Sequence, residues 1–178
     1  MMGYRCGLRC SEALALRPSD IALDEGHVHV QHGKGGKSRR IGLPDDAVEA
    51  VRAWWAASNV SFVHHDSSNN VAYMTPYSAV SVSNVAHHPQ WAFPTSSAGK
   101  LRTSYIRSLL PRLARRAGLG KRLHFHGLRH TFAWELSQEG VPMPIIQRAL
   151  GHANLNTTAV YLDHMSPHDV IEATRNRA

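Results

Sequence analysis

The segment 123–162 limits the folds open to this chain more than any other, because it reads as three short helices joined by tight turns. Apolar residues recur at helical spacing over 127–139, which predicts the first helix. Gly140 stands where a left-handed C-terminal cap is wanted. We expect a second helix to stop at Gly151 and a third to begin near Asn156, a good N-cap residue.

Four polar side chains stand out in this segment: His126, Arg129, His152 and Tyr161. His126 and Arg129 are three residues apart, so they project from neighbouring positions at one helix end. Such a group suits a phosphate, because arginine offers a planar fork of donors and stays charged. A tyrosine hydroxyl is a candidate nucleophile, although ionising it at pH 7 costs about 4 kcal/mol, which nearby cations and an imidazole could offset. Taken singly, each of these residues is more often a cap or a packing residue, but the joint pattern favours chemistry.

Two motifs carry a family resemblance: HGLRHTFA at 126–133 and ALGHANLNTTAVYL at 149–162. They resemble the C-terminal half of tyrosine recombinases, the phage-integrase and Xer type of site-specific DNA recombinase. That family carries H-x-x-R, a later L-G-H, and a nucleophilic tyrosine nine residues after that histidine. Tyr161 follows His152 by nine residues, and His152 follows Arg129 by 23, a usual gap for the family.

The segment Gly7–Leu14, GLRCSEAL, resembles the G-L-R-x-S-E-L box of the same family. The arginine of that box is the family's first catalytic arginine, and the resemblance carries this role to Arg9. Without the resemblance, Arg9 reads as a surface charge. Glu12 could either orient Arg9 or pair with it, and both interpretations stay open.

A period of two over residues 20–43 predicts three strands, at 21–23, 27–31 and 39–43. The turn at 33–37, GKGGK, lacks the G-K-[ST] ending of a nucleotide-binding P-loop, so that function is excluded for it.

The resemblance implies a catalytic lysine in this turn, as the acid that protonates the leaving 5′ oxygen. By position that residue is Lys34. Lys37 and Arg39 are expected to contact the DNA backbone.

Two further helices are predicted, at 44–57 and 103–117. Pro111 should kink the second one or split it in two. Its basic residues are expected to contact the DNA backbone, with a solvated face as the alternative; they are Arg107, Arg112, Arg115 and Arg116. Residues 58–97 are polar and rich in turns, and we expect an insertion that touches DNA or a neighbouring subunit. Its two histidine pairs lack the carboxylates or cysteines that would favour a metal site.

The net charge of +7 and the pI near 9.9 indicate an anionic partner, with nucleic acid first. No apolar run approaches the roughly 20 residues that span a membrane, and no secretory signal opens the chain. Cys6 and Cys10 are too few for a zinc site, so we expect thiols in a reducing cytoplasm. The predicted location is the cytoplasm, at the nucleoid, in a protein of bacterial or phage type.

The resemblance implies the fold of a tyrosine-recombinase catalytic domain, mainly α with a small three-stranded antiparallel β-sheet. Family members usually begin with a separate DNA-clamping domain, whereas here the G-L-R box starts six residues in. Residues 1–178 are therefore expected to be a single catalytic domain without the usual N-terminal core or arm DNA-binding domain. A fragment and a natural short form are both consistent with this.

The resemblance also implies the chemistry. The catalytic residues would be Arg9, Lys34, His126, Arg129, His152 and Tyr161, with Tyr161 as the nucleophile. The enzyme would cleave and rejoin double-stranded DNA through a 3′-phosphotyrosyl link, with neither metal nor cofactor, and would assemble as a tetramer during strand exchange. Two alternatives stay open: relaxation of supercoils in the manner of a type IB topoisomerase, and a non-catalytic DNA-binding module.

Overall fold

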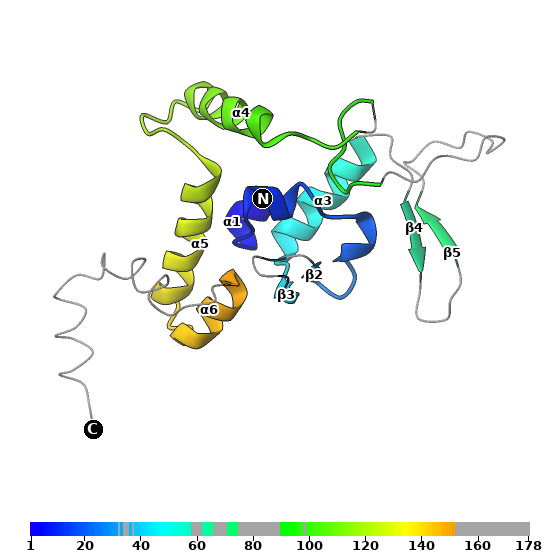
Figure 1. The fold of residues 1–178 in the computed structure, drawn as a ribbon, viewed down its shortest axis with the longest axis horizontal. Coiled ribbons are helices and arrows are strands. Elements are labelled where there is room, and N and C mark those ends of the chain that lie inside the picture. The colour runs from blue at the N-terminus through cyan, green and yellow to red at the C-terminus, as the bar shows by residue number, and fades with distance from the viewer. Residues whose placement is uncertain are drawn as a thin grey trace.

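The computed structural model of this chain describes residues 1–31, 33, 36, 38–57, 62–65, 71–74, 90–97 and 99–151. Its helices are α1 (Met2–Arg5), α2 (Cys10–Ala13), α3 (Asp45–Ala57), α4 (Thr103–Arg116), α5 (Phe125–Gln138) and α6 (Met143–Leu150). Its strands are β1 (Ile21–Ala22), β2 (His27–Val30), β3 (Arg39–Gly42), β4 (Phe62–His65) and β5 (Val71–Met74). The fold is mostly helical with a small three-stranded antiparallel sheet, as predicted (Figure 1). The helix expected to carry Tyr161 lies outside the described residues.

The three-stranded sheet runs in the order β1-β2-β3, and both pairs are antiparallel. Val28 lies opposite Ile41, and Val30 lies opposite Arg39. Because successive side chains of a strand point to opposite faces, these four residues share the inner face of the sheet. The strand positions predicted from the period of two are therefore confirmed.

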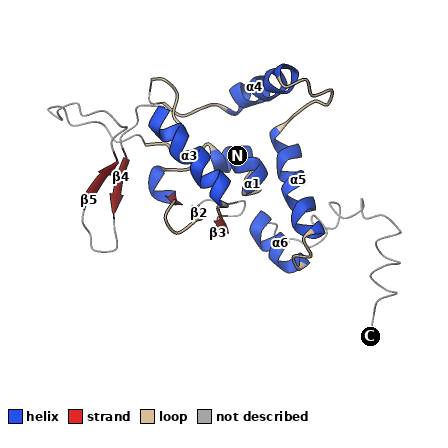
Figure 2. Ribbon diagram, turned by 180° about the vertical axis from the view of Figure 1, so that it is seen from behind, coloured by secondary structure: helices blue, strands red, loops and turns tan. Residues whose placement is uncertain are grey.

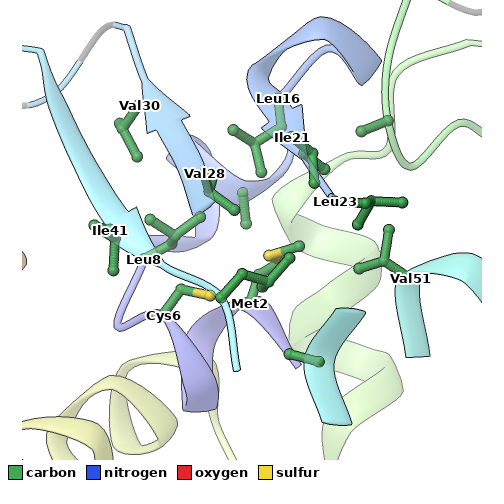
Figure 3. Close-up of a cluster of buried hydrophobic side chains, with 14 residues drawn as sticks. Met2, Cys6, Leu8, Leu16, Ile21, Leu23, Val28, Val30, Ile41 and Val51 are labelled. Atoms are coloured by element: carbon green, nitrogen blue, oxygen red, sulfur yellow. The ribbon is translucent and has the colours of Figure 1, made fainter. Parts of the chain in front are cut away.

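The larger hydrophobic core lies between this sheet and the helices α1 and α3. Figure 3 shows Met2, Cys6 and Leu8 gathered beside Val28 of β2. Cys6, Leu8 and Val28 are fully buried. The helix α3 buries Val51 in this cluster, at the apolar face that the sequence predicts. Burying a side chain of this size stabilises the fold by about 1.5–3 kcal/mol, so this core secures the sheet that carries Arg39.

A second hydrophobic cluster joins α5 to α6. Phe132 of α5 packs with Ile146 and Leu150 of α6. Gly140 makes the turn between the two helices with a φ of +74°, which confirms the predicted left-handed cap. In Figures 1 and 2, α5 lies beside α1 on one side, and α6 lies near the sheet; α1 contacts α5, and α6 contacts both α5 and β3.

The helix α4 runs unbroken through Pro111, so the predicted alternative of two separate helices is wrong. Ala114 is its one buried residue. Leu113 is 44% exposed. Figure 2 shows the reason: α4 lies at the edge of the molecule, where few neighbours cover it.

The segment 58–97 contains strands that the sequence analysis did not predict. β4 and β5 pair antiparallel, with Val63 opposite Tyr73, and they form a sheet of their own (Figure 1). Neither strand alternates apolar with polar residues, since β4 reads FVHH and β5 reads VAYM, so no period of two marks them in the sequence. Within the described part of the chain, no helix is long and apolar enough to cross a bilayer.

Candidate active site

Arg129 lies in the second turn of α5 and is one of the most deeply buried side chains, with 1% of its surface exposed. Its Nη1 donates to the carbonyl oxygen of Gly7 at 2.5 Å, and its Nη2 donates to that of Leu150 at 2.6 Å. His124 caps the helix, because its Nδ1 accepts a hydrogen bond of 2.7 Å from the Gly127 amide. The guanidinium is thus held in place between the G-L-R box and the end of α6.

Arg9 is the N-cap residue of α2, and the Glu12 side chain accepts from its backbone amide. The Glu12 carboxylate accepts from the Arg9 amide and from Arg9 Nη1, each at 2.8 Å. Arg9 Nη2 donates to the carbonyl oxygen of Gly151 at 3.3 Å. The Arg9 side chain keeps 26% of its surface exposed, which leaves it within reach of a ligand.

Glu12 is buried between two arginines. Arg39 of β3 donates to both of its oxygens, from Nη1 at 3.1 Å and from Nη2 at 2.7 Å. Burial alone would raise the pKa of Glu12, but the hydrogen bonds and charges of Arg39 and Arg9 outweigh it and hold the pKa at about 2. The carboxylate is therefore ionised at every working pH. Glu12 has both of the roles that the sequence left open, because it pairs with Arg9 and also fixes the position of Arg9.

Three arginines hold three successive carbonyl oxygens at the C-terminal end of α6. Arg39 Nε donates to Ala149 at 2.8 Å, while Arg129 and Arg9 donate to the next two residues. The last carbonyls of a helix have no partner inside the helix and carry partial negative charge, so cations are favourable there. Gly151 ends the helix in the left-handed region, with a φ of +65°. His152 is the next residue in the chain, but it lies outside the described residues.

His126 lies in the first turn of α5 and is exposed, with its ring 4.3 Å from that of His130 in an edge-to-face arrangement. Partial burial and the positive charges of Arg129 and Arg9 lower the pKa of His126 below its usual 6.5. The imidazole is therefore neutral near pH 7. A neutral imidazole beside two guanidiniums is able to accept a proton.

The structure brings together three of the six predicted catalytic residues: Arg9, His126 and Arg129. Lys34, His152 and Tyr161 lie outside the described residues, as does the predicted DNA contact Lys37. The predicted DNA contacts on α4 are all exposed; they are Arg107, Arg112, Arg115 and Arg116. Among the described residues, no three His, Cys, Asp or Glu side chains are grouped to hold a metal ion.

Arg39 does not occupy the exposed position expected of a DNA contact. Its side chain is only 6% exposed, and its donors are directed to Glu12 and Ala149 inside the protein. The strand pattern contained the signal for this: Arg39 lies two residues before Ile41, which is buried, and therefore on the same face of β3. Arg40, on the other face, is exposed.

The chemistry available at this site is the binding of an anion. The described cluster holds three guanidinium groups, Arg9, Arg39 and Arg129, and one carboxylate, Glu12, which pairs with the first two, so positive charge is in excess. Arg9 and Arg129 donate to the adjacent carbonyl oxygens of Gly151 and Leu150, so the two guanidinium groups lie near each other, Arg9 partly exposed and Arg129 buried.

A model of the phage integrase family matches residues 1–168 of this chain. The tyrosine recombinase XerC of Xanthomonas campestris pv. campestris (strain B100) is 33% identical over 177 residues, which cover 98% of this chain and 47% of that protein. A tyrosine recombinase of Thermosipho africanus (strain TCF52B) is 30% identical over 173 residues, covering 97% of this chain and 50% of that protein. The chain thus spans about half the length of the curated relatives it matches.

Solved structures have the same fold. The XerA recombinase matches with a TM-score of 0.73 and 26% identity, over 99% of this chain and 56% of that one. The XerH site-specific recombinase, bound to a palindromic difH substrate in a post-cleavage complex, matches with a TM-score of 0.67 and 26% identity, over 98% of this chain and 43% of that one. The catalytic domain of bacteriophage HP1 integrase, at 17% identity and a TM-score of 0.55, has the same fold.

Proposed function

Because this chain belongs to the phage integrase family, we propose that it is the catalytic part of a tyrosine recombinase, which cleaves and rejoins DNA strands site-specifically. The observation that carries this proposal is the convergence of Arg9 and Arg129 on adjacent carbonyl oxygens at the end of α6, directly before His152. That arrangement brings the G-L-R box, the H-x-x-R motif and the L-G-H motif to one place, although they are far apart in the sequence.

The proposed reaction is a transesterification at one DNA phosphodiester. The Tyr161 hydroxyl attacks phosphorus, the new bond joins its oxygen to the 3′ phosphate, and the bond from phosphorus to the 5′ oxygen breaks. His126 takes the tyrosine proton, since its lowered pKa keeps it neutral. Lys34 gives a proton to the leaving 5′ oxygen. The reverse attack by a 5′ hydroxyl, from the same or another duplex, rejoins the strand.

The two arginines supply the electrostatic part. Arg9 and Arg129 hold the non-bridging oxygens and stabilise the charge that develops as phosphorus becomes five-coordinate, and His152 donates a further hydrogen bond. Both arginines are already fixed by carbonyl partners, so little reorganisation is needed when the phosphate arrives. Removing one preorganised donor of this kind costs about 3–4 kcal/mol, or roughly 10²–10³-fold in rate.

The proposed partner is double-stranded DNA, in keeping with the charge of +7 and with the DNA-bound XerH relative. The exposed arginines of α4 are the proposed contacts with its backbone. Strand exchange between two sites calls for self-association, and a tetramer on DNA is the proposed assembly. Because the proposed substrate is DNA, the proposed location is the cytoplasm, at the nucleoid.

A covalent-trapping assay tests this proposal. The chain and its Tyr161→Phe variant are incubated with nicked duplexes that lose a short fragment on cleavage, drawn from a wide pool of sequences. On a denaturing gel, we expect an adduct of protein and DNA with Tyr161 present and none with phenylalanine. Sequencing the trapped DNA then gives the preferred site.

Each alternative function predicts a different result in the same assay. Adducts spread evenly over the pool, together with relaxation of supercoiled plasmid, would favour a topoisomerase-like activity. A shifted band on a native gel without any adduct would favour a DNA-binding module and would refute the catalytic proposal.

A further inference from the structure

Arg39 connects separate segments of the chain inside the site. Its guanidinium donates through all three nitrogens, to both oxygens of Glu12 and to the carbonyl oxygen of Ala149. Its partners come from two segments that are 27 and 110 residues away in the sequence. One buried side chain of β3 therefore ties the G-L-R box to the end of α6.

The pairing of Arg39 with Glu12 sets the position of Arg9. Two parallel N–H···O bonds form a bidentate arrangement, which fixes the plane of the carboxylate as well as its distance. Glu12 then accepts from the amide and from Nη1 of Arg9 with the same two oxygens. If Arg39 were absent, the carboxylate would be free to rotate, and the Arg9 guanidinium would move with it.

Arg39 also sets the position of the chain that leads into the L-G-H motif. A Cβ atom on Gly151 would lie 3.0 Å from Arg39 Nη1, so the guanidinium lies directly against the backbone of this glycine. Its bond to Ala149 holds the preceding turn of α6. The glycine thus allows both the left-handed helix end and the close approach of the arginine.

We propose that Arg39 is a positioning residue of the strand-cleavage reaction: it orients Arg9 through Glu12 and holds the backbone that precedes His152. In this role Arg39 does not contact DNA, because all three of its guanidinium nitrogens already donate to Glu12 and Ala149. This inference rests on the proposed function, since Arg39 can position catalytic groups only if the chain catalyses strand cleavage.

The test separates DNA binding from the cleavage step in the full chain. Single-turnover cleavage of the trapping substrate is measured at increasing protein concentration and fixed salt, which gives a half-saturating concentration and a maximal rate. For Arg39→Met we expect a half-saturating concentration within about threefold of the native value and a maximal rate about 100-fold lower, the effect of a small misplacement of a catalytic group.

Two variants serve as controls. Arg39→Lys keeps the charge, but one ammonium cannot serve both Glu12 oxygens and Ala149 in the same plane, so we expect the maximal rate to stay at least about tenfold low. This variant also covers the case in which the methionine variant fails to fold, which thermal unfolding would reveal. Arg40→Met removes the same charge from the exposed face of the same strand, and we expect it to keep the maximal rate.

A double-mutant cycle checks that Arg39 acts through Arg9. In an Arg9→Ala background, Arg39→Met should slow cleavage by clearly less than in the native background, because only its hold on the backbone before His152 remains to be lost. Full multiplication of the two effects would overturn the proposal. A raised half-saturating concentration with an unchanged maximal rate in Arg39→Met would also overturn the proposal, and it would make Arg39 a DNA contact. An equal loss of maximal rate in Arg40→Met would overturn the proposal as well. If the native chain forms no adduct, the proposed function fails and the inference fails with it; if the native chain cleaves and the Arg39 variants do too, only the inference fails.

Discussion

Replacing Glu12 by glutamine perturbs the centre of the arginine cluster with almost no change in volume. The native carboxylate accepts four hydrogen bonds, two from Arg9 and two from Arg39. A glutamine amide has one accepting oxygen, and its NH₂ group can only donate. Whichever way the amide is turned, two N–H donors of the arginines face another donor.

The expected loss of stability can be worked out in three ways. Losing two hydrogen bonds to a charged group costs about 3–6 kcal/mol in total. Breaking a buried ion pair by removing one partner costs about 3–5 kcal/mol. The fall of the Glu12 pKa from 4.5 to about 2 corresponds to about 3 kcal/mol. We therefore expect Glu12→Gln to lower the free energy of unfolding by about 3–5 kcal/mol and the melting temperature by roughly 6–20 °C.

Urea denaturation followed by circular dichroism measures this loss, with Glu49→Gln on the exposed surface of α3 as the matched control. The pH dependence gives a second readout. The folded-state pKa of Glu12 lies below its unfolded value, so its contribution is complete above about pH 4.5 and is lost as the pH falls toward 2. The difference between the native chain and Glu12→Gln should therefore shrink over that interval.

A loss below about 1 kcal/mol would refute this reasoning, because it would mean that the cluster is as weak as exposed surface pairs. A difference that does not change between pH 5 and pH 2 would refute the assignment of the pH dependence to this carboxylate, whatever the loss at neutral pH.

Three further predictions concern neighbouring positions. Gly7→Ala places a Cβ atom 2.3 Å from the Phe132 ring at a φ of +57°, so we expect it to lower the free energy of unfolding by about 2–5 kcal/mol in urea denaturation. Gly151→Ala, at a φ of +65° and against Arg39, should cost about 1–3 kcal/mol by the same measurement and also slow cleavage. The maximal cleavage rate should rise with pH and level off with a midpoint below 6.5 in a single-turnover profile, because His126 accepts a proton only when neutral and its pKa is lowered.

Gly118→Ala is the control for both glycine variants, since Gly118 has a φ of +69° and no atom near its Cβ position. Equal losses at Gly118 and Gly7 would show that backbone strain alone is responsible and that the ring contact does not matter. A midpoint at pH 7 or above in the rate profile would contradict the role of His126.

The regular elements of this fold could be read from local patterns. The period of two located β2 and β3, and the caps at Gly140 and Gly151 located the ends of α5 and α6. Each of these signals depends only on neighbours a few residues away, and so it is present in the sequence itself. The β4–β5 hairpin was missed because its strands, FVHH and VAYM, do not alternate apolar with polar residues.

The two arginines proposed as catalytic were identified by their motifs, and Glu12 was a candidate partner of Arg9, whereas their other partners were not predicted. The motif spacing pointed to Arg9 and Arg129, but it could not say that Glu12 serves two arginines or that Gly7 and Leu150 supply the carbonyl partners of Arg129. The prediction of Arg39 as a DNA contact followed from its charge. Its burial in the fold depends on which face of β3 meets the core.

The sequence by itself thus determined the main helices, the strands of the three-stranded sheet and the residue types available for phosphate chemistry, because these depend on periodicity and on side-chain chemistry. Only the tertiary structure decided that Arg39, Glu12 and the end of α6 meet, since those partners are 27 and 110 residues from Arg39 along the chain. Contacts at such separations arise from how two hydrophobic cores and one sheet pack together, and no local pattern encodes that packing.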